Sequence, residues 1–154
     1  MLDIELIKSK LFSTNKDERL RGLLHIRYLI NHDRETSDFF DLAVKHIEDK
    51  DSDCRWQAII IIGEFLNTRQ DDIWNIIITH GSSDNSDIRT AIATVLLEHF
   101  FEENSNLFDA KFETISKEIS KGNKNLIDTL SICRFDLPEN SQIEQMNKLL
   151  IDNM

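Results

Sequence analysis

The stretch Asp51–Gly63, DSDCRWQAIIIIG, poses the question on which the fold depends. Its four consecutive isoleucines are β-branched and suit a buried strand, whereas the preceding DSDCR has the polar residues of a helix start. Local propensity does not separate these two states. The rest of the chain does, because the same pattern of residues recurs at a fixed interval.

Three segments share the pattern when they are aligned 34 residues apart: RLRGLLHIRYL from Arg19, DCRWQAIIIIG from Asp53 and DIRTAIATVLL from Asp87. One column of the alignment holds the arginines Arg21, Arg55 and Arg89. The apolar columns are Leu20/Cys54/Ile88, Leu24/Ala58/Ile92 and Tyr28/Ile62/Leu96. Their i, i+4, i+8 spacing is that of one helical face and not the two-residue period of a half-buried strand. The isoleucine run is therefore predicted to be helical.

A second set of amphipathic segments repeats at the same interval: DFFDLAVKHI from Asp38, DIWNIIITHG from Asp72 and NLFDAKFETI from Asn106. Phe40, Trp74 and Phe108 align in this set as an aromatic column. Polar segments rich in Asn, Asp and Ser separate the helices and supply capping residues. Each unit is thus predicted to be a helix–turn–helix, and a period of this length is typical of a stacked α-solenoid.

The segment Asp53–Gly63 resembles the first helix of HEAT-like repeats, in which an aspartate, an aliphatic residue, an arginine, small or aliphatic residues and a glycine follow in order. The copy from Asp87 has Leu97 at the glycine position, and the first copy has Arg19 for the aspartate and Leu29 for the glycine. The resemblance implies an all-α fold, a short α-solenoid of about three to four HEAT-like helix–turn–helix repeats with helical caps. In such repeats the aspartate and arginine commonly form a ladder, which implies a structural role for Arg21, Asp53, Arg55, Asp87 and Arg89.

The predicted organisation is a single HEAT-like domain over residues 1–154. Its parts are a capping helix within residues 1–15, three repeats over residues 16–120 and a divergent cap over residues 121–154. In the last part Pro138 breaks the chain, and Ser141 with Glu144 has the pattern of a capping box that restarts a helix.

The composition is acidic, with a net charge of −10 and a pI near 4.9. An acidic surface repels phosphate backbones and anionic membranes and favours basic partners. Cys54 and Cys133 fit no metal or redox spacing and are read as reduced thiols. The longest apolar run is far shorter than the ~20 residues of a membrane-spanning helix. We expect a cytoplasmic protein that binds neither nucleic acid nor membrane.

No motif for phosphate binding, zinc proteolysis, serine hydrolysis or paired-cysteine chemistry occurs in the sequence. His99, Glu102 and Glu103 share a helical face, but one helix supplies at most two or three metal ligands. His46 and His80 align in the repeat and are expected to be surface histidines near helix ends. We therefore expect no catalytic residue, no cofactor and no metal.

Two surfaces are candidates for binding a partner. In HEAT-like proteins the second helices line the concave face, where the repeat places the polar positions Asp38, Asp41, Asp72, Asn75, Asp109 and Glu113. A solvated polar face explains the same pattern equally well. Trp56 and Ile60 occupy variable first-helix positions, where the tryptophan either anchors a partner or packs against a neighbouring loop.

The expected function is a non-catalytic protein-binding module, most specifically a small acidic inhibitor or immunity-type neutraliser of a basic protein such as a toxin or nuclease. The chain is expected to be monomeric when unbound. One alternative is an adaptor or subunit of a larger assembly that docks through Trp56. A second alternative is an enzyme similar to HEAT-like DNA glycosylases, but their groove requires basic residues where this chain has acidic ones.

Overall fold

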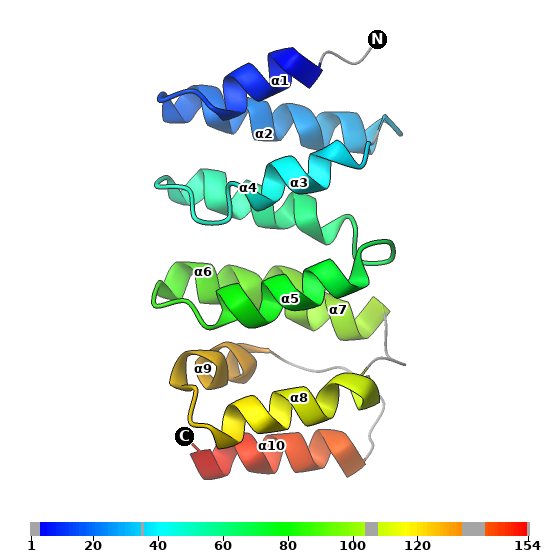
Figure 1. Ribbon diagram of the computed structural model, residues 1–154, viewed down its shortest axis with the longest axis vertical. Coiled ribbons are helices and arrows are strands. Elements are labelled where there is room, and N and C mark those ends of the chain that lie inside the picture. Colours follow the sequence, from blue (N-terminus) through cyan, green and yellow to red (C-terminus); the bar gives the residue numbers. More distant parts are fainter. Residues whose placement is uncertain (1–3, 35, 104–107, 134–140, 154) are drawn as a thin grey trace. The chain divides into compact units, whose positions relative to one another are not determined.

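The computed structural model describes residues 4–34, 36–103, 108–133 and 141–153, and every regular element in these ranges is a helix (Figure 1). The chain divides into two compact units, Met1–Phe65 and Leu66–Met154. Each unit is described by itself.

The first unit contains two helical hairpins. The helices are α1 (Ile4–Leu11), α2 (Lys16–Asn31), α3 (Asp38–Val44) and α4 (Ser52–Gly63). α2 packs against both α1 and α4, and α3 packs against α4. α2 and α4 run in the same direction, and α1 and α3 run opposite to them (Figure 1). The fully buried core comes from all four helices and includes Ile7, Leu11, Leu23, Ile26, Phe39 and Ile59.

The isoleucine run is helical, as the repeat predicts. Asp51 caps α4 by accepting a hydrogen bond from the backbone N–H of Cys54 at 3.0 Å. Ile59, Ile61 and Ile62 are fully buried, and only Ile60 of the run has intermediate exposure. Burial on most sides of the helix explains how β-branched residues are tolerated there, because tertiary packing outweighs their modest helix propensity.

A glycine lets the first two helices approach closely. A Cβ atom built on Gly22 of α2 would lie 2.9 Å from Cδ2 of Leu11 in α1. That distance is shorter than real Cβ contacts, so a side chain at this position would push the α1 leucine out of its place.

In the second unit, three consecutive helical segments form one long helix. α6 (Ser86–Ala91) continues through a π-helical segment, η1 (Ile92–Leu97), into α7 (Glu98–Glu103). α5 (Gln70–Gly81) packs against α6 and η1. The remaining helices are α8 (Phe108–Ser120), α9 (Lys124–Ile132) and α10 (Ser141–Asn153). α10 packs against α8 and α9, and α9 packs against α5, α6 and η1. Each segment for which the pattern predicts a helix thus contains one in the part that the structure describes.

The repeat has a different register in α2 from the one that the sequence alignment predicts. The N-cap residues of the three first helices are Asn15, Asp51 and Asn85. Four residues after each cap stands an arginine whose Nη1 donates to the backbone carbonyl six residues earlier: Arg19 to Ser13, Arg55 to Asp49 and Arg89 to Ser83, at 3.1, 2.9 and 2.8 Å. Arg19 therefore corresponds to Arg55 and Arg89, and the predicted equivalence of Arg21 is wrong.

Burial follows the observed register. Leu23 and Ile26 of α2 are fully buried, whereas Leu24 and Tyr28 are 44% and 57% exposed. The sequence alignment placed Leu24 and Tyr28 in apolar core columns, and the structure places them on the surface. The alignment failed in α2 because it assumed equal intervals. The interval from Arg19 to Arg55 is two residues longer than the interval from Arg55 to Arg89.

Within the described ranges, no helix combines the length and the apolar character that crossing a membrane requires.

Candidate protein-binding surface

An arginine and a carboxylate connect the two hairpins of the first unit. Arg19 on α2 donates from Nε and Nη2 to the two carboxylate oxygens of Asp49, each at 2.9 Å. Its Nη1 donates to the carbonyls of Ser13 and Thr14, both at 3.1 Å. Asp49 lies between α3 and α4, so one guanidinium fixes the α1–α2 connection to the α3–α4 connection.

The carboxylate of Asp49 has hydrogen-bond partners on three residues. Besides Arg19, it accepts from the backbone N–H of Asp51 at 2.9 Å and contacts Nδ1 of His46 at 3.0 Å. Burial by itself raises the pKa of Asp49, but the hydrogen bonds from Arg19, Asp51 and His46 outweigh it and hold the pKa well below its ordinary value. Reciprocally, the hydrogen bond to Asp49 raises the pKa of Arg19.

His46 is buried at 5% exposure, so the expectation of a surface histidine is wrong for this residue. Its ring lies 6.1 Å from the ring of Phe12, and its Nε2 is buried without a hydrogen-bond partner. A histidine oriented by a carboxylate is one part of many catalytic centres. Here Nε2 is inaccessible to a solute in this conformation, which favours a structural role for the Asp49–His46 pair.

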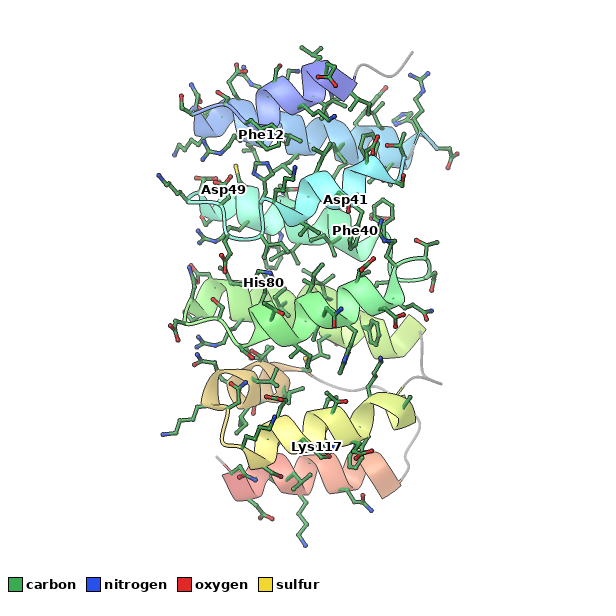
Figure 2. All side chains as sticks on the ribbon, in the orientation of Figure 1. Phe12, Phe40, Asp41, Asp49, His80 and Lys117 are labelled. Carbon is green, nitrogen blue, oxygen red and sulfur yellow. The ribbon has the colours of Figure 1, made fainter. Side chains whose placement is uncertain are left out.

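An open pocket of about 420 Å³ lies beside this network at the end of the first unit. Phe12 and Asp49 lie at that end, near the hairpin connections (Figure 2). Nζ of Lys45 lies 5.4 Å from the centre of the Phe12 ring, a cation–π geometry. Three of the polar residues that line the pocket, Arg19, His46 and Asp49, are hydrogen-bonded in one network.

The predicted ladder residues make contacts that the sequence does not reveal. Arg21 is exposed, and its Nη1 lies 3.9 Å from Glu18. Arg89 of α6 pairs with Asp128 of α9, with Nη2 at 3.0 Å from Oδ2. The acids paired with Arg19 and Arg89 are thus Asp49 and Asp128. Asp53 and Asp87 are exposed in the first turns of their helices, and their ladder role stays a prediction.

The predicted acidic positions lie on helices of both units. Asp38 and Asp41 are exposed on α3, and Asp72 and Asn75 are exposed on α5. Asp72 accepts from Nε of Arg69 at 2.7 Å, and Glu113 on α8 pairs with Lys117 at 3.1 Å. The side chain of Asp109 lies outside the described residues. Carboxylates therefore face solvent on α3, α5 and α8, and a common ridge stays a prediction.

Helices α2 and α4 carry several large apolar side chains that are exposed to solvent. Leu24 and Tyr28 of α2 and Trp56 of α4 are all more than 40% exposed. Sequence reasoning identified Trp56 and Ile60 but missed the α2 residues, because the alignment assigned them to the core. The signal that identifies them is the Asn15 cap, which fixes where α2 begins and so sets its buried face.

Both cysteines and His80 are at least partly shielded from solvent. Cys54 and Cys133 are free thiols, and burial raises the pKa of each to about 12. His80 is half-buried in the last turn of α5. The described residues contain no group of three or more His, Cys, Asp or Glu side chains that could hold a metal ion. The side chains of Glu102 and Glu103 fall outside those residues.

No protein-family model matches the chain, and searches of curated proteins and of solved structures found no match.

Proposed function

We propose that this protein is a non-catalytic, HEAT-like binding module whose partner is a basic protein, most specifically that it inhibits or neutralises such a protein. The observation that carries the proposal is the net charge of −10 combined with exposed carboxylates on helices of both units. Asp38 and Asp41 on α3 and Asp71 and Asp72 on α5 are examples.

Electrostatics supports this choice over a nucleic-acid or anionic-membrane partner. Like charges on one surface lower stability, and a basic partner offsets that cost on binding. Complementary charge also accelerates encounter, which suits a protein that must reach a harmful target before it acts. A polyanionic partner would meet repulsion at the same surface.

Complex formation with a cognate partner tests the proposal. The proteins encoded by the reading frames adjacent to this one are co-expressed with it, and each mixture is analysed by size-exclusion chromatography with multi-angle light scattering. The expected result is a stoichiometric complex with a basic protein, accompanied by loss of that protein's activity. A complex that leaves the activity intact would instead support the adaptor alternative, and a complex with an acidic protein would contradict the proposal.

The adaptor function is favoured by a different observation, the exposure of Trp56 beside other apolar side chains. An adaptor holds two proteins at once, whereas a neutraliser needs one. Native mass spectrometry of the complex distinguishes these stoichiometries.

A further inference from the structure

The open pocket of the first unit combines an apolar wall with polar groups. Its volume is about 420 Å³, which is within the range of sites for small molecules. Leu11, at the end of α1, is fully buried, and the next residue, Phe12, is 56% exposed (Figure 2). Both line the pocket, so its apolar wall extends from the core to the surface.

The imidazole of His46 brings an unsatisfied polar atom to this pocket. His46 is one of the lining residues, and its side chain is only 6% exposed. Its Nε2 is buried and has no hydrogen-bond partner among the described residues. A buried polar atom without a partner costs free energy. A ligand that supplies the missing hydrogen bond would remove this cost.

The contacts of Asp49 determine which hydrogen bond Nε2 can make. Oδ2 of Asp49 lies 3.0 Å from Nδ1 of His46 and accepts from Nε of Arg19 at 2.9 Å. Oδ1 accepts from Nη2 of Arg19 and from the backbone N–H of Asp51, each at 2.9 Å. Burial opposes ionisation, but these hydrogen bonds hold the pKa of Asp49 well below its ordinary value, so the carboxylate is ionised and only accepts. In the neutral imidazole Nδ1 therefore carries the proton, and Nε2 is an acceptor.

Phe12 is placed to control access to the imidazole. The centres of the Phe12 and His46 rings are 6.1 Å apart, and both residues line the pocket. More than half of Phe12 faces solvent, and the side chain directly follows the last residue of α1. Exposed side chains change rotamer within picoseconds to nanoseconds, so the Phe12 ring can turn aside without unfolding a helix.

The charges that line the pocket favour an anionic ligand. Arg19 and Asp49 neutralise each other in their two-point ion pair. The other lining carboxylate, Glu48, already has an interaction partner. Lys45 and Lys50 also line the pocket, and both are exposed. Two ammonium groups are thus present at the rim of this pocket, although the chain as a whole has a net charge of −10.

We propose that this pocket binds a small aromatic hydroxy acid. The hydroxyl of the ligand donates to Nε2 of His46, and the ligand ring packs against Phe12, which turns aside to admit it. Aromatic pairs contribute more than their apolar area alone. The carboxylate of the ligand pairs with Lys45 and Lys50. Asp49 acts as a positioning residue that holds His46 in the acceptor tautomer. This site goes beyond the proposed function and does not depend on a basic protein partner.

The probe is 4-hydroxyphenylacetate, which combines a hydroxyl, an aromatic ring and a carboxylate. Phenylacetate lacks the hydroxyl, and 4-hydroxyphenylacetamide lacks the negative charge. Chemical-shift titrations of the nitrogen-15-labelled full chain, at slightly alkaline pH, measure the dissociation constant of each compound and locate the residues that respond. We expect 4-hydroxyphenylacetate to bind with a dissociation constant of about 1 mM or lower and each analogue to bind about fivefold more weakly.

Substitutions assign the contacts. Lys45→Gln/Lys50→Gln should raise the dissociation constant of 4-hydroxyphenylacetate about fivefold and leave that of the uncharged amide unchanged. Lys148→Gln is the matched control, because it removes an exposed lysine on α10 and should change neither constant. His46→Phe keeps an aromatic ring without the acceptor, so it should abolish the preference for 4-hydroxyphenylacetate over phenylacetate. Circular dichroism checks that each variant is folded.

The comparison of the three compounds on the unsubstituted chain decides the inference even if His46→Phe does not fold. Equal dissociation constants for 4-hydroxyphenylacetate and phenylacetate would overturn the hydrogen bond to His46. Equal constants for the acid and the amide would overturn the contact with the two lysines. No binding up to about 10 mM, or shifts confined to the second unit, would overturn the site itself. None of these results bears on the basic-partner proposal, which complex formation tests separately.

Discussion

Arg19 and Asp49 form a two-point ion pair, with Nε–Oδ2 and Nη2–Oδ1 distances of 2.9 Å each. The side chains are only 14% and 5% exposed, so water competes weakly for these hydrogen bonds. The pair joins α2 to the connection between α3 and α4. It is also what distinguishes Arg19 from Arg21, which lies two residues further along the same helix.

Arg19→Ala should lower the free energy of unfolding by about 1–3 kcal/mol, because it leaves the buried Asp49 carboxylate without its main partner. Arg21→Ala is the matched control. Its side chain is 72% exposed and contacts Glu18 only at 3.9 Å, so the change should stay within about 0.5 kcal/mol. Urea unfolding followed by circular dichroism measures both. A larger loss for Arg21→Ala would restore the register that the sequence alignment predicts.

The stability of the protein should depend on the charge of Asp49. Its pKa is lower in the folded protein than in the unfolded chain, so its stabilising contribution is complete above the ordinary aspartate pKa of about 4 and is lost as the pH falls. The Asp49→Asn variant should therefore have a lower free energy of unfolding than the wild type at neutral pH. This difference should become smaller as the pH falls from about 5 to about 2. A gap for Asp49→Asn that widens on acidification would contradict this sign.

Both cysteines should react slowly with thiol reagents in the native protein. Burial raises the pKa of Cys54 and of Cys133 to about 12, so thiolate is scarce at pH 8. Labelling with iodoacetamide, followed by mass spectrometry, should be much slower for the native protein than for the chain in denaturant. Each of the variants Cys54→Ser and Cys133→Ser keeps one cysteine, so its labelling rate belongs to that cysteine. Fast native labelling of either cysteine would show that it is more accessible than described.

The helices could be predicted from the sequence because their apolar positions recur. In isolation, the run Ile59–Ile62 would be predicted to be a strand. Comparison with the related segments from Arg19 and Asp87 predicts a helix instead, and α4 confirms that prediction. When a pattern repeats, the helix propensity of the other copies decides between helix and strand for a copy that fits both.

The register of α2 could not be predicted in this way, because RLRGLLHIRYL fits two alignments almost equally well. The observed one is set by the cap motif, in which Asn15 accepts from the backbone N–H of Asp17 at 2.8 Å and its own N–H donates to Ser13. Asn85 and Ser83 repeat this arrangement. Cap residues thus specify where a helix starts more sharply than its apolar stripe does.

The candidate site was predictable only in part. Trp56 stood out by its type, whereas Leu24 and Tyr28 became surface residues only when the cap was placed. In the Arg19–Asp49–His46 network, Arg19 and Asp49 are 30 residues apart in the sequence. No local sequence pattern indicates a contact over that separation.

The acidic surface should act through long-range attraction. Asp38→Asn/Asp41→Asn on α3 should lower the association rate constant with a basic partner and flatten its dependence on salt, because the screening length falls from ~30 Å at 0.01 M to ~8 Å at 0.15 M. Stopped-flow fluorescence measures the rate at both ionic strengths. The dissociation rate should change little, and a rate constant indifferent to salt and to both substitutions would place the contacts elsewhere.

The orientation of α2 decides whether Leu24 and Tyr28 can contact a partner at all, and two adjacent leucines test it. Leu23 is fully buried, and Leu24 is 44% exposed. The measurement is the free energy of unfolding in urea for Leu23→Ala and Leu24→Ala. The structure predicts a loss of about 2–5 kcal/mol for Leu23→Ala and a change within about 0.5 kcal/mol for Leu24→Ala. A large loss for Leu24→Ala with a small one for Leu23→Ala would place Leu24 in the core and remove the exposed apolar surface of α2.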